Sequence, residues 1–144
     1  MLIKYLFVLL TLAIIISFSC NNGKSIKDKV DVEGNLDNGE PQISFVETDF
    51  DFGDILIGEI VSHKFKYRNT GTGKLEIKET IANCGCSKVK VGNNPILAGQ
   101  ESYIEITFDS RGFHGLQIKK VEIITNISKQ PVNLIISANV EMSK

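Results

Sequence analysis

The chain has 144 residues, which is enough for one domain with additional terminal segments. Its 16 Lys and Arg residues nearly balance its 17 Asp and Glu residues, and the formal net charge is -1. No long run of Lys and Arg occurs, which excludes the electrostatic footprint of a nucleic-acid-binding protein. The apolar residues are unevenly distributed and divide the chain into three segments.

The first segment, residues 1–19, has the pattern of an export signal. Lys4 gives it a positive start, and residues 5–16 are almost wholly apolar. A run of this length is typical of a signal peptide, whereas a membrane-spanning helix needs roughly 20 apolar residues. A retained membrane helix is the alternative, because the run from Leu2 to Phe18 approaches that length. We expect a signal-peptide helix that directs export.

The residues that follow this apolar run indicate a lipid attachment site. Ser17, Phe18 and Ser19 directly precede Cys20, and this arrangement resembles the lipobox of bacterial lipoproteins. The stricter lipobox pattern has Leu at the position of Ser17. The resemblance implies that the signal peptide is cut before Cys20, which then carries the lipid that anchors the protein to a membrane. The alternative is a free thiol at the end of a helix.

The second segment, residues 20–40, is mostly polar. It is rich in Asn, Gly, Asp and Lys, and it contains neither an aromatic residue nor a sustained period. Such a segment cannot bury enough apolar surface to fold. We expect a flexible tether that spans on the order of 25 Å root-mean-square. Residues 21–24 lack the early acidic cluster associated with surface export in some bacteria, which favours a position facing the periplasm.

The third segment, residues 41–144, alternates apolar and polar residues with a period of two, which is the period of a β-strand with one buried face. The expected inward-facing residues are Val61, His63, Phe65, Tyr67, Leu75, Ile77, Ile104, Ile106, Phe108, Val132, Leu134, Ile136, Ala138 and Val140. Turns rich in Gly, Asn and Pro separate these runs, and no helical stripe follows residue 40. About seven short strands without helices predict an all-β fold, an immunoglobulin-like β-sandwich.

Several short motifs occur in this segment in a fixed order. Residues 50–55 read Phe-Asp-Phe-Gly-Asp-Ile, residues 69–71 read Asn-Thr-Gly, and residues 82–86 read Ala-Asn-Cys-Gly-Cys. Together they resemble the bacterial "domain of unknown function 1573" family over most of residues 44–140. The resemblance implies an immunoglobulin-like fold, similar to interaction modules of larger bacterial and ciliary proteins. It implies no established activity.

The Cys-Gly-Cys sequence is the strongest candidate in this chain for a chemically reactive site. In one interpretation, Cys84 and Cys86 are small, partly buried residues that shape a turn with Gly85. In a second interpretation, they form a disulfide and act as a redox pair, because an exported protein meets an oxidising compartment. A bridge across one residue removes little loop entropy, so it suits a redox element better than a structural staple.

In a third interpretation, the two thiolates hold a soft metal ion such as Cu(I), with His63, His114 or Met142 as a further ligand. The spacing is not that of a zinc knuckle, and no second cysteine pair is present. The apolar row around His63 favours a hydrogen-bonded core residue, and the Gly-flanked turn around His114 favours an exposed loop residue. We therefore expect neither a metal nor a cofactor.

Two other groups of residues are candidates for contacts with partners. Arg111 and Phe113 lie in a Gly-containing turn, and exposed Arg and aromatic side chains anchor many interfaces. A buried Phe113 that closes the end of the sandwich is the alternative. Asp49, Asp51 and Asp54 lie close together in the sequence, but their spacing is not that of a calcium-binding loop.

The function favoured by these features is binding rather than catalysis. The sequence contains no nucleophile elbow, no phosphate loop and no pair of carboxylates in a pocket pattern. We expect a membrane-tethered binding or scaffolding module of the cell envelope, lipid-anchored through Cys20, whose partner is an envelope protein or glycan. The alternative is a thiol redox or copper-handling lipoprotein that uses Cys84 and Cys86.

Overall fold

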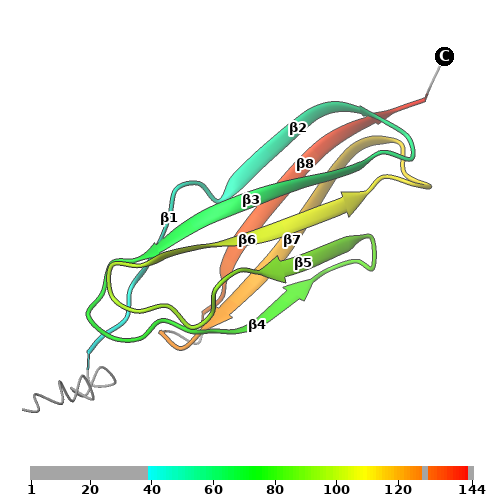
Figure 1. The fold of residues 1–144 in the computed structure, drawn as a ribbon. Helices are drawn as coiled ribbons and strands as arrows, with labels where there is room; N and C mark the ends of the chain where they lie inside the picture. Colours follow the sequence, from blue (N-terminus) through cyan, green and yellow to red (C-terminus); the bar gives the residue numbers. More distant parts are fainter. Residues whose placement is uncertain (1–38, 128–129, 143–144) are drawn as a thin grey trace, which may run out of the picture. The chain divides into compact units, whose positions relative to one another are not determined.

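The computed structural model describes residues 39–127 and 130–142 (Figure 1). The expected signal peptide, Cys20 and residues 20–38 of the expected tether lie outside the described residues, so export and lipidation stay predictions. Among the described residues, no helix has both the length and the apolar character needed to cross a membrane.

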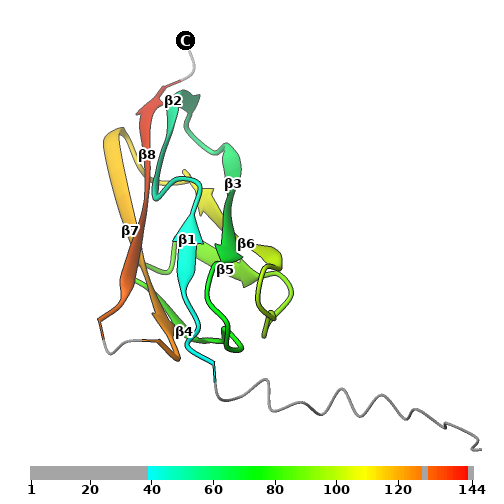
Figure 2. The ribbon, with the colours of Figure 1, turned by 90° about the vertical axis from the view of Figure 1, so that its left-hand side faces the viewer.

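The described residues form eight strands in two sheets of four. One sheet has the order β1-β3-β6-β5, built from Ile43–Phe45, Ile60–Asn69, Glu101–Asp109 and Ser87–Val91. The other has the order β2-β8-β7-β4, built from Asp49–Leu56, Val132–Glu141, Gly115–Thr125 and Ile77–Ala82. Neighbouring strands are antiparallel, except that β2 runs parallel to β8. Figure 2 shows the sheets as two facing layers, which confirms the predicted β-sandwich.

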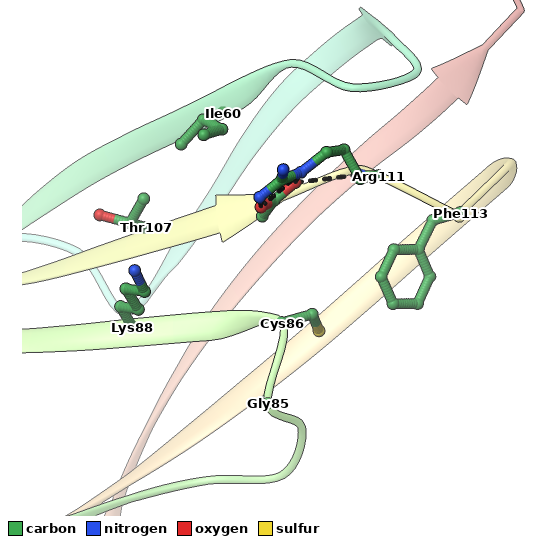
Figure 3. Close-up of a pocket in the computed structure, with 8 residues that line it drawn as sticks. Ile60, Gly85, Cys86, Lys88, Thr107, Arg111 and Phe113 are labelled. Carbon is green, nitrogen blue, oxygen red and sulfur yellow. Dashed lines mark hydrogen bonds and ion pairs between the residues drawn. The ribbon is translucent and has the colours of Figure 1, made fainter.

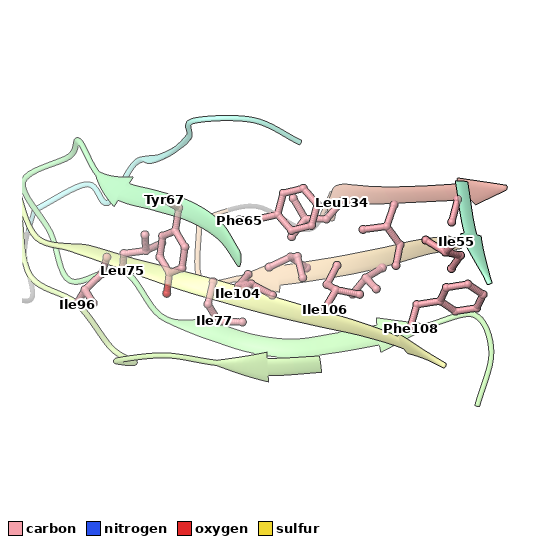
Figure 4. Close-up of a cluster of buried hydrophobic side chains, with 14 of the residues drawn as sticks. Ile55, Phe65, Tyr67, Leu75, Ile77, Ile96, Ile104, Ile106, Phe108 and Leu134 are labelled. Carbon is pink, nitrogen blue, oxygen red and sulfur yellow. The ribbon is translucent and has the colours of Figure 1, made fainter. Parts of the chain in front are cut away.

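The interior between the sheets is filled by the apolar rows that the alternation predicts. Phe65, Ile106 and Leu134 are each 0% exposed, whereas their sequence neighbours face solvent or the outer side of a sheet (Figure 4). Burial on one face explains the period of two, because successive side chains of a strand point to opposite sides. The other members of this buried cluster are Ile55, Tyr67, Leu75, Ile77, Ile96, Ile104, Phe108, Val121, Ile123, Ile136, Ala138 and Val140.

The part of the chain before β4 differs from the strand that its sequence pattern predicts. The alternation of residues 74–78 predicts a strand there, but Leu75 forms an isolated bridge with Ile96, and β4 begins at Ile77. The chain is crossing from the sheet that holds β3 to the sheet that holds β4 at this point. Leu75 is buried in that crossing, so it has the periodicity of a strand without continuous pairing.

A buried asparagine joins three connections at one end of the sandwich. Asn69 is 0% exposed, and its Nδ2 donates to the carbonyl oxygens of Gly73 at 2.8 Å and Ile96 at 3.4 Å. Its Oδ1 accepts from the backbone N–H groups of Gly71 at 3.1 Å and Gln42 at 3.3 Å. Because a buried polar group is costly without partners, this asparagine fixes where the chain enters β1 and leaves β3.

We expect Phe65→Ala to destabilise the protein by about 3–5 kcal/mol, because the substitution leaves a cavity between the two sheets. Lys66→Ala, at the next position of β3 on the exposed face, is the matched control and is expected to change the unfolding free energy by less than about 0.5 kcal/mol. Urea unfolding of both variants measures the difference. Equal effects at the two positions would contradict the assignment of the buried face.

Candidate functional site

The candidate site is the crossing between β4 and β5. The chain leaves one sheet after Ala82 and enters the other at Ser87, so residues 83–86 connect the two layers. Cys84 and Cys86 lie in this crossing and are joined by a disulfide with an S–S distance of 1.99 Å and a Cα–Cα distance of 5.3 Å. The structure thus presents the two cysteines as a bonded pair rather than as free thiols.

Hydrogen bonds hold the turn independently of the disulfide. The Ser87 N–H donates to the Cys84 carbonyl oxygen at 3.4 Å, and the Asp109 N–H donates to the Cys86 carbonyl oxygen at 3.1 Å. The second bond ties the turn to the end of β6. The Ser87 hydroxyl oxygen lies 3.5 Å from the Cys84 Sγ and 4.0 Å from the Cys86 Sγ. Gly85 is exposed at the tip, and Cys86 packs partly against the core.

A hollow of about 310 Å³ lies on the Cys86 side of the turn (Figure 3). The residues that line it come from β3, β5, β6, the turn and the β6–β7 connection: Ile60, Gly85, Cys86, Lys88, Thr107, Asp109, Arg111 and Phe113. Both members of the predicted contact patch, Arg111 and Phe113, therefore share one site with Cys86. The sequence predicts the patch and the cysteine pair separately, and it does not predict that they lie at one site.

An ion pair fixes the charged side of this hollow. The Arg111 Nε donates to the two carboxylate oxygens of Asp109 at 2.9 and 3.0 Å. This hydrogen-bonded guanidinium lowers the pKa of Asp109 from its ordinary 3.8 to about 2, and the carboxylate in turn raises the pKa of Arg111. Both side chains are therefore charged at neutral pH and largely neutralise each other. Arg111 is exposed, so its guanidinium remains accessible to a partner.

Phe113 closes the end of the sandwich and also lines the hollow. Its ring centroid lies 5.6 Å from that of the buried Phe108, and the side chain is partly buried against the core. The Lys119 Nζ lies 4.3 Å from the centre of the Phe113 ring and 5.5 Å from that of Phe108, which are distances of cation–π contacts. Phe113 thus packs against the core, as one of the two sequence-based interpretations predicts, and it also lines the hollow, whereas a contact with a partner stays a prediction.

A second hollow, of about 220 Å³, lies on the Cys84 side of the turn. It is lined by Asn83, Cys84, Ile118, Lys119 and Lys120. The disulfide therefore lies between two hollows, with Cys86 lining one and Cys84 lining the other.

This second hollow adjoins a strand edge that is left unpaired by the crossing. The pairing of β4 with β7 ends at Ala82 opposite Val121, because the chain turns away after Ala82. Residues 115–120 of β7 pair with β8 on one side, and no described strand pairs with them on the other. We call residues 115–120 the open β7 edge. On its outer face, Leu116 is 68% exposed and Ile118 is 63% exposed.

The exposure of Leu116 and Ile118 is not among the predictions from the sequence, although the sequence contains a signal for it. The buried residues of β7 are Val121, Ile123 and Thr125, which have odd numbers. Leu116 and Ile118 have the opposite parity, so in a single strand they must lie on the outer face. Two large apolar residues on a face expected to be polar indicate a contact surface, but this inference needs the bounds of the strand.

The two histidines lie apart from any metal-binding cluster. His63 Nε2 is 2.9 Å from Glu47 Oε1, and its ring stacks on that of Phe50 with centroids 3.6 Å apart. His114 is exposed in the turn before β7, and its carbonyl oxygen accepts a hydrogen bond from Gln117. Within residues 39–127 and 130–142, no three His, Cys, Asp or Glu side chains are grouped so that they could hold a metal ion.

Two of the three aspartates of β2 accept hydrogen bonds from the neighbouring strand β8. Asp51 accepts a hydrogen bond from the Ser137 hydroxyl at 2.9 Å, and Asp54 accepts one from the Asn139 amide at 2.9 Å. Both partners belong to β8, so these carboxylates stabilise the parallel β2–β8 pair on its outer face.

Solved structures with the same architecture come from different kinds of protein. A protein of unknown function from Porphyromonas gingivalis W83 matches 70% of this chain with a TM-score of 0.58 and 20% identity, and 46% of that protein is covered. The VesB protease of Vibrio cholerae matches 69% of this chain with a TM-score of 0.55 and 16% identity, and 32% of it is covered. The ASH / PapD-like domain 7 of human CEP192 matches 73% of this chain with a TM-score of 0.53 and 12% identity, and 89% of it is covered.

These likenesses show the fold alone, because the identities are low. This chain spans less than half of the first two solved structures, at 46% and 32% of their lengths. No curated protein matches the chain. A family model described as "Protein of unknown function (DUF1573)" matches residues 43–140. This range contains the Cys84–Cys86 turn and all eight strands, except for the last residue of β8. The chain therefore belongs to the DUF1573 family, as the order of its motifs predicts.

Proposed function

We propose that this protein is a membrane-tethered binding module of the cell envelope that takes up an extended segment of a partner protein along the open β7 edge. The observation that carries the proposal is the unpaired edge of residues 115–120, with Leu116 and Ile118 exposed beside it. The lipobox-like sequence before Cys20 supports the tether. In this proposal the open β7 edge acts by binding.

An unpaired strand edge binds extended segments through its backbone. In an antiparallel strand, every second residue directs its N–H and C=O groups to one side, so residues 115–120 present such groups away from β8. A partner segment that adds a strand there gains main-chain hydrogen bonds, and its alternate side chains contact the two faces of the sheet. On the outer face these contacts are Leu116 and Ile118, which favour apolar side chains in the partner.

The inward side of the open β7 edge adds a charge requirement. Lys119 has the parity of the buried residues of β7, and its Nζ lies over Phe113 and donates to the Gln117 Oε1 at 3.0 Å. An inward-facing cation discourages indiscriminate pairing of an open edge. A segment with a carboxylate at the position opposite Lys119 would compensate it. We therefore expect a partner segment with outward apolar residues and one inward acidic residue.

The other sheet edges are less suited to such pairing. Residues 60–65 of β3 also have a partner strand on one side only, but their outer face carries the exposed Lys64. Strand β1 is three residues long, and β2 has an irregularity between Asp51 and Asp54. Strand β5 exposes Lys88 and Lys90, and β4 has an irregularity between Ile77 and Glu79. Short strands, bulges and exposed lysines are the usual protections of an edge against pairing. The open β7 edge pairs with β8 without a register shift and carries exposed apolar side chains.

A random peptide library displayed on phage tests this proposal on the purified full-length protein. We expect enrichment of peptides with alternating apolar residues and an acidic residue, and chemical-shift changes centred on residues 115–120. Ile118→Lys should weaken binding of the enriched peptide about tenfold, or about 1.4 kcal/mol, because it places a charge against the apolar side chains. Val46→Lys, at a position that is 79% exposed beside β1, is the matched control and should leave binding unchanged.

Lys119→Glu distinguishes binding at the open β7 edge from non-specific binding. The peptides that this variant enriches should carry a basic residue in place of the acidic residue at one position. Enrichment of no extended peptide, shift changes confined to other strands, or equal effects of Ile118→Lys and Val46→Lys would contradict the proposal. If the protein binds a glycan and Ile118→Lys does not change that binding, the proposed binding of an extended protein segment would be wrong.

The tether is tested by the intact mass of the protein extracted from bacterial membranes. We expect loss of residues 1–19 and the mass of acyl chains on Cys20, because the peptidase cuts lipoproteins before the modified cysteine. Cys20→Ala should abolish the acyl mass and release the mature protein from the membrane fraction. A mass that retains residues 1–19 without acyl chains would show a membrane-helix anchor instead and would contradict lipidation.

A further inference from the structure

The position of the Cys84–Cys86 bond calls for an explanation other than stability. The bond closes a ring across the single residue Gly85, so it removes little conformational entropy from the unfolded chain. The turn is already held by the backbone hydrogen bonds of Ser87 to Cys84 and of Asp109 to Cys86. The disulfide therefore adds little to the stability of this turn. A role in which the bond opens and closes would explain its presence there.

We propose that the Cys84–Cys86 pair is a thiol–disulfide exchange centre whose co-reactant is a dithiol of another exported protein. Cys86 lines the hollow of about 310 Å³, and Cys84 lines the smaller hollow of about 220 Å³. The larger hollow gives an incoming thiolate a route to Cys86 past Phe113 and Arg111 (Figure 3). The geometry assigns Cys86 as the sulfur that is attacked and Cys84 as the leaving thiolate.

The surroundings of Cys84 suit a leaving thiolate. The Ser87 hydroxyl is 3.5 Å from the Cys84 Sγ and can donate a hydrogen bond to the sulfur once it carries a negative charge. Lys119 and Lys120 line the same hollow as Cys84, and nearby cations favour a thiolate over a thiol. Lys120 is paired with Glu122 at 2.7 Å, so Lys119 contributes more of the positive potential. A stabilised leaving thiolate speeds exchange.

The exchange proceeds in two balanced steps. The first thiolate of the partner attacks the Cys86 Sγ, the Cys84–Cys86 bond breaks, and its electron pair stays on the Cys84 sulfur as a thiolate. The second thiol of the partner loses its proton to water and attacks the partner's own sulfur in the mixed disulfide, which releases the Cys86 thiolate. The two cysteines then take up two protons from water. The partner dithiol is oxidised to a disulfide, and the Cys84–Cys86 pair is reduced by two electrons.

The site of attack is tested with glutathione as the probe on the oxidised full-length protein. After a short reaction with reduced glutathione, free thiols are blocked with an alkylating reagent and the protein is mapped by mass spectrometry. We expect glutathione on Cys86 and the alkyl group on Cys84. We also expect the protein to oxidise a reduced two-cysteine peptide while the circular-dichroism spectrum stays that of the folded state. Glutathione predominantly on Cys84, or opening of the bond only on unfolding, would overturn the proposal.

Ser87→Ala tests the role assigned to the hydroxyl. The rate of opening by reduced glutathione should fall about three- to tenfold, because the net contribution of a typical hydrogen bond is roughly of this size. The thermal midpoint should not change, and Ser62→Ala, on the exposed face of β3, should change neither quantity. An unchanged opening rate in Ser87→Ala would overturn this role. The proposal does not rest on strand binding at β7, because peptide binding and thiol exchange are measured separately.

Discussion

The chain passes from one sheet to the other between Ala82 and Ser87, and this crossing sets the geometry of the whole candidate site. Packed sheets are separated by about 10 Å, so residues that span this distance cannot also continue a strand. The pairing of β4 with β7 therefore ends opposite Val121. The disulfide, the two hollows beside it and the open β7 edge all follow from the point at which this pairing stops.

The buried face of each strand could be predicted from the sequence because it is a local property. Phe65, Ile106 and Leu134 are buried because they lie on the apolar face of strands whose other face is exposed to solvent. This alternation is visible in the sequence without a structure. The meeting of Cys86 with Arg111 and Phe113 could not be predicted. It depends on the register of β5 against β6, which pairs Ser87 with Phe108 and is set by long-range packing.

The two proposed activities use neighbouring groups and share one side chain. Strand binding uses the backbone of residues 115–120 with Leu116 and Ile118, whereas thiol exchange uses Cys84, Cys86 and Ser87. Lys119 is common to both, because it faces inward from the open β7 edge and also lines the hollow beside Cys84. A partner segment with a carboxylate opposite Lys119 would lower the positive potential at Cys84 and slow the release of its thiolate. Binding and exchange would then be coupled through one side chain.

Hydrogen exchange of the β7 backbone amides tests most directly whether the crossing leaves this strand half paired. One alternate set of amides points toward β8, which pairs with Gly115–Ile123, and the other set points to the side on which β4 lies. In the second set, the account predicts slow exchange from Val121 onwards, where β4 pairs with β7, and exchange at least about a hundredfold faster in residues 115–120. Equal protection of every amide from Gly115 to Thr125 would show that the edge is covered and would contradict the account.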